Sequence, residues 1–237
     1  KAFITNHVIG KSRENRSMNM MEINEANSSK ALMIISRQHP PEVTGFLAMK
    51  SFIETLTGET ELATEFREKY TVFCVPLMNP DGVDNGHWRH NAGGIDLNRD
   101  WAWQTQLESR QRVGLYNRWM PHVHVDFHEM GYDAGYYFAP AAEPYHKCIT
   151  DFQRDFQVDI GKNHAKYFDK EGWLYFTREI FDLFYPSYGD TWPTFNGAVG
   201  MTYEQAGHGM SGREIKLSNG DTLKIQDRID HHTKTAL

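Results

Sequence analysis

A histidine and a glutamate stand three residues apart in the segment "ALMIISRQHPPEVTGF", directly after an apolar, strand-like block. Prolines and charged residues gather in surface turns, so His39 and Glu42 could simply mark a turn. The alternative is that both side chains chelate one divalent metal ion from a short loop. A His-x-x-Glu pair alone is weak evidence, and the polar residues elsewhere in the chain decide between these interpretations.

A third candidate ligand, His128, lies near the end of the segment "HVHVDFHEM". Two histidines and one glutamate leave the fourth position of a tetrahedral ion open, as in catalytic zinc sites. One zinc ion suits this nitrogen and oxygen donor set better than magnesium or calcium, which prefer oxygen. In the same segment we expect His122 and His124 to be buried hydrogen-bond partners. Asp126 either orients a ligand histidine or serves the fold alone.

Glu204 ends the segment "GAVGMTYE", which carries no other charged residue. A carboxylate beside a zinc-bound water is the usual general base in metal-assisted hydrolysis. Taken alone, a glutamate at a strand end would instead be assigned to a salt bridge. Together with the three candidate ligands, Glu204 favours a hydrolase.

Two arginines flank a glycine-rich loop in "HWRHNAGGIDLNRDW". A guanidinium near the metal, such as that of Arg89, can stabilise the oxyanion that forms when a carbonyl is attacked. A second one, Arg99, suits bidentate capture of a carboxylate, and Asn98 beside it can add a hydrogen bond. The segment therefore predicts a pocket for a carbonyl compound that carries a free carboxylate.

Apolar segments lead into these polar residues, and their lengths and compositions predict strands over 31–36, 70–77, 122–130 and 197–204. Between and after them, helical spacing of apolar residues predicts helices over 42–57, 104–119, 143–169 and 222–237. Strands alternating with helices predict an α/β fold with a mixed, largely parallel twisted sheet and helices on both faces. In such sheets the ligand crevice lies beyond the carboxyl ends of the strands, which is where the polar residues fall.

Composition limits the function classes further. The chain has 237 residues, of which 40% are hydrophobic, enough to bury the core of a single domain. A formal net charge of −6 gives no reason to expect nucleic acid as a partner, and no apolar run is long enough for membrane insertion. Its two cysteines make no disulfide framework, and no pattern predicts an oligomeric state.

The segments "HPPE", "NPDGVDNGHWRHNAGGIDLNRDW", "VDFHE" and "MTYEQAG" resemble, in order and spacing, the zinc metallocarboxypeptidases of the carboxypeptidase A-like family. The resemblance runs from about Lys11 to the last predicted helix. It is closest to large bacterial members, with some similarity to cytosolic carboxypeptidases. It implies an α/β/α sandwich, one zinc ion per chain and hydrolysis of the C-terminal bond of peptides or proteins.

Position by position, the resemblance implies a role for each motif residue. It makes Glu204 the general base and Arg89 the group that polarises the scissile carbonyl. A mobile tyrosine that closes over the substrate matches Tyr185 or Tyr188 in "FYPSYGDTW", and the spacing to Glu204 favours Tyr185. The metal ligands are then His39, Glu42 and His128, and the residues that bind the substrate carboxylate are Asn98 and Arg99.

Three positions and the opening segment depart from the family pattern or bear on specificity. Pro41 stands where the family often has Arg or Gly, and Glu129 places a carboxylate next to a ligand. Asp190 favours a basic terminal side chain, or else caps a turn. The opening part of the family domain, before Lys11, is absent or reduced. We therefore expect residues 1–237 to form a single catalytic domain that lacks its N-terminal portion and belongs to a longer chain.

Two other functions remain open at this point. The same zinc ligands and a carboxylate-binding arginine would serve an amidase acting on N-acyl amino acids or peptidoglycan peptides. A non-catalytic domain that keeps zinc and binds peptide C-termini is the third possibility. The bacterial resemblance favours a secreted or periplasmic protein, but the first residue is Lys1 and no targeting segment can be read.

Overall fold

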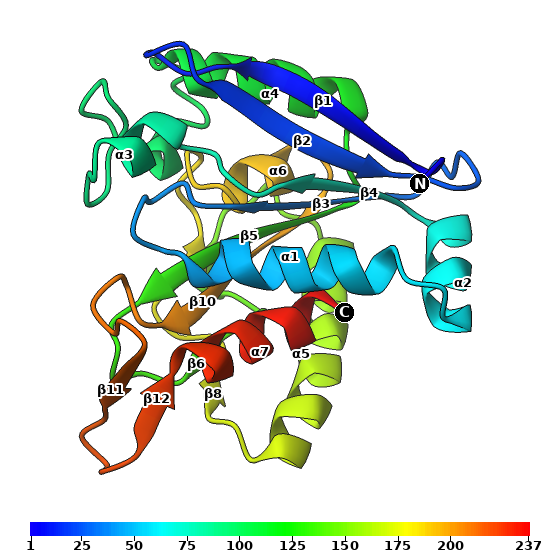
Figure 1. Ribbon diagram of the computed structural model, residues 1–237. Coiled ribbons are helices and arrows are strands. Elements are labelled where there is room, and N and C mark those ends of the chain that lie inside the picture. Colours follow the sequence, from blue (N-terminus) through cyan, green and yellow to red (C-terminus); the bar gives the residue numbers. More distant parts are fainter.

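A central sheet of eight strands carries helices on both faces in the computed structural model, which describes residues 1–237 (Figure 1). The strand order is β1-β2-β4-β3-β5-β10-β6-β8. The strands of this sheet are β1 (Ile4–Lys11), β2 (Ser17–Ile23), β3 (Ala31–Ser36), β4 (Thr71–Val75), β5 (Val123–Met130), β6 (Tyr136–Tyr137), β8 (Tyr175–Phe176) and β10 (Val199–Ala206). Two small ribbons pair β7 (Ala142–Tyr145) with β9 (Asp182–Leu183) and β11 (Glu214–Lys216) with β12 (Thr222–Lys224).

The four central strands, β4, β3, β5 and β10, are mutually parallel. β4 and β10 are buried along their whole length, which explains why β4, TVFCV, is an almost continuous apolar run. Antiparallel pairs flank this centre, with β2 against β4 on one side and β6 against β10 on the other. The predicted fold class, a mixed and largely parallel α/β sheet, is confirmed.

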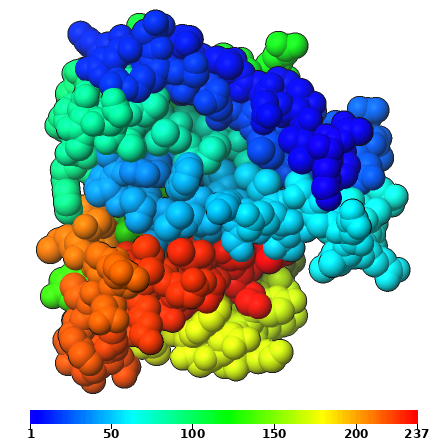
Figure 2. Space-filling view, viewed as in Figure 1, coloured from blue at the N-terminus to red at the C-terminus, as the bar shows by residue number.

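The helices divide between the two faces. They are α1 (Thr44–Leu56), α2 (Glu61–Lys69), α3 (Pro80–Asp84), α4 (Leu107–Trp119), α5 (Asp151–Glu171), α6 (Thr191–Phe195) and α7 (Ile225–Ala236), with a 3₁₀ turn at Leu97–Arg99. On one face α7 lies between α1 and α5, as Figure 2 shows. Phe52, Phe127 and Phe168 belong to the apolar core beneath this layer. On the other face α4 helps to bury a second core that contains Trp101 and Tyr116.

The structure corrects two local predictions and contains one hairpin that was not predicted. Residues 143–169 do not form one helix, because β7 ends at Tyr145 and α5 begins only at Asp151, where Thr150 and Gln153 form a capping box. The predicted helix over 222–237 begins only at Ile225, because residues 222–224 form β12 of the β11–β12 hairpin. The edge hairpin of β1 and β2 was not predicted at all. No helix is long and apolar enough to cross a membrane.

Candidate metal centre and substrate pocket

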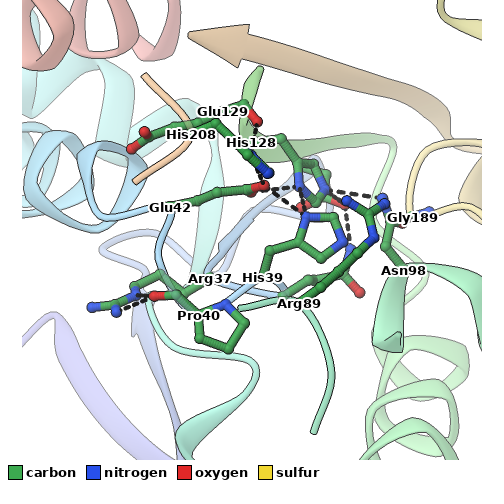
Figure 3. Close-up of polar contacts among 12 residues, drawn as sticks. Arg37, His39, Pro40, Glu42, Arg89, Asn98, His128, Glu129, Gly189 and His208 are labelled. Carbon is green, nitrogen blue, oxygen red and sulfur yellow. Dashed lines mark hydrogen bonds and ion pairs between the residues drawn. The ribbon is translucent and has the colours of Figure 1, made fainter. Parts of the chain in front are cut away.

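The three predicted ligands meet in one buried cluster at the ends of β3 and β5 (Figure 3). His39 Nδ1 lies 2.8 Å from Glu42 Oε1, and His128 Nδ1 lies 2.9 Å from Glu42 Oε2. The two Nδ1 atoms are 3.2 Å apart. A tetrahedral zinc ion with ordinary bond lengths separates its ligand atoms by roughly 3.3 Å, so this donor set fits zinc.

Carboxylates outside the cluster fix which imidazole nitrogen faces the metal position. His39 Nε2 lies 3.0 Å from Asp96 Oδ1, and His128 Nε2 lies 2.8 Å from Asp126 Oδ2. Each carboxylate accepts a hydrogen bond from the Nε2–H group, so the proton stays on Nε2 and Nδ1 keeps a lone pair for a metal. Asn98 Nδ2 also lies 3.2 Å from His128 Nε2. With the proton on Nε2, both atoms are donors, so Asn98 does not hydrogen-bond to this ring nitrogen in that tautomer. Of the two roles left open for Asp126 by the sequence, its contact with His128 is the one that an orienting role requires.

Glu42 is an anion despite its burial. Desolvation opposes its ionisation, but the rings of His39 and His128 hold the pKa of Glu42 well below its ordinary value. Burial would likewise raise the pKa of Asp96, yet His39 and the guanidinium groups of Arg89 and Arg99 hold it below its ordinary value. The cluster therefore offers one negative charge to a divalent cation, and Asp96 places a second negative charge just outside it.

The loop that carries His39 and Glu42 is fastened at both ends. Arg37, with a φ of +55°, donates from its guanidinium to the carbonyl oxygen of Pro40. Helix α1 begins two residues after Glu42, and its first residue, Thr44, donates from its backbone N–H (2.8 Å) and its hydroxyl (2.6 Å) to Glu129 Oε1. Glu129, which the sequence places as a carboxylate next to a ligand, thus binds the otherwise unpaired N-terminus of α1.

Replacement of Thr44 with valine tests this attachment. Thr44→Val removes the hydroxyl donor but keeps the side-chain shape, and a buried carboxylate loses one of its partners. We expect the free energy of unfolding to fall by about 1–3 kcal/mol, measured by urea denaturation. Thr55→Val, in the same helix but exposed, is the control and should change it by less than about 0.5 kcal/mol. Equal effects of the two changes would contradict a special role for Glu129.

Glu204 lies beside the cluster because β10 runs parallel to β5 and pairs Glu204 with His128 in register. Its carboxylate lines a pocket of about 390 Å³ whose wall also includes His39, Glu42 and Arg89. Burial raises the pKa of Glu204 to about 8. A carboxyl group with a raised pKa holds a proton more readily, as a residue that accepts and returns a proton must.

The predicted carboxylate-binding residues line the same pocket. Asn98 Oδ1 accepts the backbone N–H of Gly189 at 2.7 Å, and this contact leaves the amide NH₂ directed toward His128. Arg99 stacks on the Tyr188 ring, with its guanidinium carbon 4.4 Å from the ring centroid, and its side chain is 41% exposed. Arg89 uses only Nε in the protein, donating to Asp96 at 2.7 Å. Both guanidinium groups thus keep donors for a ligand.

Of the two candidate tyrosines, Tyr188 rather than Tyr185 lines the pocket. The phenol of Tyr185 instead accepts a hydrogen bond from Trp103 Nε1 at 2.8 Å. The spacing argument that favoured Tyr185 compared distances along the chain. The stacking of Arg99 on Tyr188 is a tertiary contact that spacing along the chain does not indicate.

Asp190 lies in the wall of the pocket and is buried. It precedes α6, but its side chain makes no capping hydrogen bond to that helix. Burial raises the pKa of Asp190 to about 6. The pocket placement is what a role in substrate choice requires. Asp190 Oδ1 also accepts a hydrogen bond from the hydroxyl of Thr191, the first residue of α6, at 3.1 Å, so the side chain contacts the start of that helix as well.

The predictions for two other histidines need correction. His124 is buried, but neither ring nitrogen has a hydrogen-bond partner, and burial lowers its pKa to about 4. Its ring packs edge-on between Trp101 and Tyr116, so it serves as an aromatic core residue. His122 is exposed, although its Nδ1 does accept the N–H of Ala31.

Sequence reasoning missed two site residues. Asp96 joins His39 to Arg89, and its position two residues before Asn98 inside the glycine-rich motif was the available signal. His208 lines the pocket, with Nδ1 2.9 Å from the carbonyl oxygen of Glu129 and 3.4 Å from Glu42 Oε1. Nothing in its local sequence indicates that position.

The first half of the chain matches a known protein family. A sequence model described as "Zinc carboxypeptidase" matches residues 1–120, half of the chain. The chain belongs to the zinc carboxypeptidase family. This match includes His39, Glu42, Arg89, Asn98 and Arg99, whereas the remaining site residues lie in the second half. The family uses zinc, and the buried donor cluster of this chain fits that ion.

Curated relatives match parts of the chain. An uncharacterised protein of Zymomonas mobilis is 36% identical over 128 residues, which are 54% of this chain and 33% of the relative. Cytosolic carboxypeptidase 1 of Xenopus laevis is 43% identical over 70 residues, 30% of this chain and 6% of the relative. The chain thus spans a third or less of these two proteins.

Solved structures match the whole chain. A metallo-carboxypeptidase from Burkholderia cenocepacia superposes with a TM-score of 0.80 at 18% identity, covering 100% of this chain and 63% of that one. The metallo-carboxypeptidase from Pseudomonas aeruginosa gives 0.81 at 17% identity, covering 99% and 63%. At this identity the likeness shows the fold, which extends through the second half that the sequence model does not match.

Proposed function

We propose that this zinc carboxypeptidase-family chain is a metallocarboxypeptidase that hydrolyses the C-terminal peptide bond of peptides or proteins. The observation that carries the proposal is one pocket lined by His39 and Glu42 of the buried His-Glu-His cluster, by Glu204, and by Arg89 and Arg99. A substrate with a free carboxylate near its scissile carbonyl satisfies all of these groups together. Residues 1–237 would act as a single catalytic domain.

The proposed chemistry divides among named side chains. Zinc held by His39, Glu42 and His128 would supply Lewis acidity at the carbonyl and make water a better nucleophile. Arg89 donates to the carbonyl oxygen as negative charge develops on it. Glu204 takes a proton from the attacking water and delivers it to the leaving nitrogen as the C–N bond breaks.

Other residues that line the pocket recognise the C-terminal end of the substrate. Arg99 offers its guanidinium to the terminal carboxylate, and Asn98 adds its amide N–H. The aromatic ring of Tyr188, stacked on Arg99, is the side chain best placed to cover a bound substrate. These contacts restrict the enzyme to the last residue of a chain and make it an exopeptidase.

Asp190 is the residue we assign to the choice of terminal side chain. It is the buried carboxylate of a wall that also contains Thr202, a hydrogen-bond partner of Asp190. A terminal Arg or Lys would pair with this charge. The Pseudomonas aeruginosa neighbour was solved with (2-guanidinoethylmercapto)succinic acid, a ligand that joins a guanidino group to carboxylates and is consistent with the same preference here.

A substrate panel with the zinc-loaded chain tests the function. Peptides ending in Arg, Lys, Leu or Glu, the same peptides with amidated C-termini, N-acyl amino acids and muropeptides are compared with and without a chelator. We expect zinc-dependent release of terminal residues from the free acids, fastest for Arg and Lys. Cleavage confined to acyl-amino acids or muropeptides would establish an amidase instead. Binding of peptides without any release would establish a non-catalytic domain.

Replacement of Arg99 tests how the chain end is recognised. Arg99→Ala removes a charge-assisted contact worth about 1.5–3 kcal/mol, so kcat/KM for free-acid peptides should fall roughly 10- to 150-fold. The zinc content should stay unchanged, because Arg99 does not contact the ligand cluster. Arg110→Ala, an exposed arginine that bonds only to loop carbonyls, is the control. An Arg99→Ala variant with the wild-type preference for free acids over amides would contradict the assignment.

A further inference from the structure

Gln38, the residue directly before the first ligand, is fully buried and points away from the pocket into the core. Its Oε1 accepts hydrogen bonds from Trp101 Nε1 at 3.0 Å and from Arg112 Nη1 at 2.5 Å. Since both of those groups are donors only, they fix the orientation of the amide. Gln38 Nε2 must therefore face the other way, where it donates to Asp126 Oδ2 at 2.5 Å.

The same oxygen of Asp126 lies 2.8 Å from His128 Nε2. A continuous run of polar contacts thus leads from Arg112 through Gln38 and Asp126 to a predicted metal ligand. Asp126 Oδ1 has no partner, so the carboxylate is held only through the oxygen that faces Gln38 and His128. The donor from Gln38 is the contact that keeps this oxygen in line with the imidazole.

Arg112 is an unexpected residue to find in a core. It comes from α4, is 3% exposed, and has no carboxylate within ion-pair distance. Its guanidinium lies 4.0 Å from the Trp101 ring centroid, and Nη2 donates to the carbonyl oxygen of Leu97 at 2.5 Å. Burial lowers the pKa of Arg112 to about 10, so it still carries its charge at neutral pH. A buried charge of this kind lowers stability unless its contacts offset the desolvation.

The backbone at Gly189 packs directly against the Asp126 and Gln38 side chains, so no side chain fits at this position. A Cβ atom at Gly189 would lie 2.2 Å from Asp126 Oδ2 and 2.8 Å from Gln38 Nε2. Gly189 also donates to Asn98, and Leu97, which Arg112 holds, precedes Asn98. The contacts of Arg112 and Gln38 thus reach both the metal cluster and the carboxylate-binding segment.

We propose that Gln38 and Arg112 are positioning residues which, through Asp126, hold the His128 ring with Nδ1 toward the metal and so set the zinc affinity of the site. This inference rests on the zinc site of the proposed function. A purely structural role would show as lower stability with unchanged zinc affinity. Outer contacts of metal ligands typically change metal affinity 10- to 100-fold, which is measurable.

The test compares zinc binding by the apo chain and its variants, using zinc alone in competition with a chromogenic chelator. Gln38→Met keeps the side-chain size and neutrality but removes every contact described above. We expect its zinc dissociation constant to rise about tenfold. The control is Gln157→Met, because Gln157 is equally buried and bonds only to Gly200 and Ala141, away from the ligands. That variant should lose stability in urea but keep its zinc affinity.

Arg112→Met provides a second, independent variant if Gln38→Met does not fold. Loss of a positive charge alone would strengthen cation binding, so a dissociation constant raised at least about threefold supports positioning over electrostatics. Wild-type zinc affinity in a folded Gln38→Met chain, or an equal loss in Gln157→Met, overturns the proposal. A wild-type chain that binds no zinc would instead overturn the metal site itself, and the positioning role with it.

Discussion

Glu204→Gln should abolish turnover while zinc stays bound. The amide has nearly the same shape as the carboxylate but cannot take a proton from water or return it to the leaving nitrogen. General acid–base catalysis contributes about 10²–10⁴-fold, so kcat should fall by at least that factor, with a smaller change in KM. Zinc content should remain near one ion per chain, because Glu204 lies beside the ligand cluster without belonging to it.

The matched control for this change is Glu25→Gln, which alters a carboxylate paired with Arg67 and outside the lining of the pocket. It should retain wild-type kcat. Single-turnover assays on a free-acid peptide, together with metal analysis of the same samples, separate loss of chemistry from loss of zinc. Substantial hydrolysis by a zinc-loaded Glu204→Gln variant would remove Glu204 from the role of base.

Glu42→Gln should remove the metal rather than the base. Glu42 is the anionic ligand of the cluster, with one oxygen facing each histidine, and a neutral amide cannot compensate the charge of a divalent cation in a buried site. The zinc dissociation constant should rise more than about 100-fold, beyond what loss of an outer contact produces. Activity should disappear at zinc concentrations that saturate the wild-type chain.

Glu54→Gln is the control, because Glu54 is an exposed glutamate of the same helix, α1, paired only with Lys50. Zinc affinity is measured by chelator competition, and folding by urea denaturation of the apo chains. Excess zinc should restore part of the activity of Glu42→Gln if the site is weakened but keeps its shape. Wild-type affinity in this variant would mean that the metal binds elsewhere.

Much of the fold could be predicted because the central strands are buried on both faces. Continuous apolar runs such as those of β3 and β4 stand out in a sequence, and β3 begins and ends where predicted, at Ala31 and Ser36. The edge hairpin β1–β2 escaped prediction because its strands are partly exposed and mix polar with apolar residues. The β7 segment was mistaken for helix because the apolar spacing of α5 was extended too far toward its N-terminus.

By itself the sequence determined that His39, His128 and Glu204 follow or end buried strands. Because parallel strands present their carboxyl ends at one edge of a sheet, these three side chains were expected at the same edge. Tertiary structure decided how each group is held. The bonds of Asp96 to His39, of Glu129 to Thr44 and of Gln38 to Asp126 join residues 57, 85 and 88 positions apart. Such contacts depend on strand order, register and rotamer, none of which a local pattern encodes.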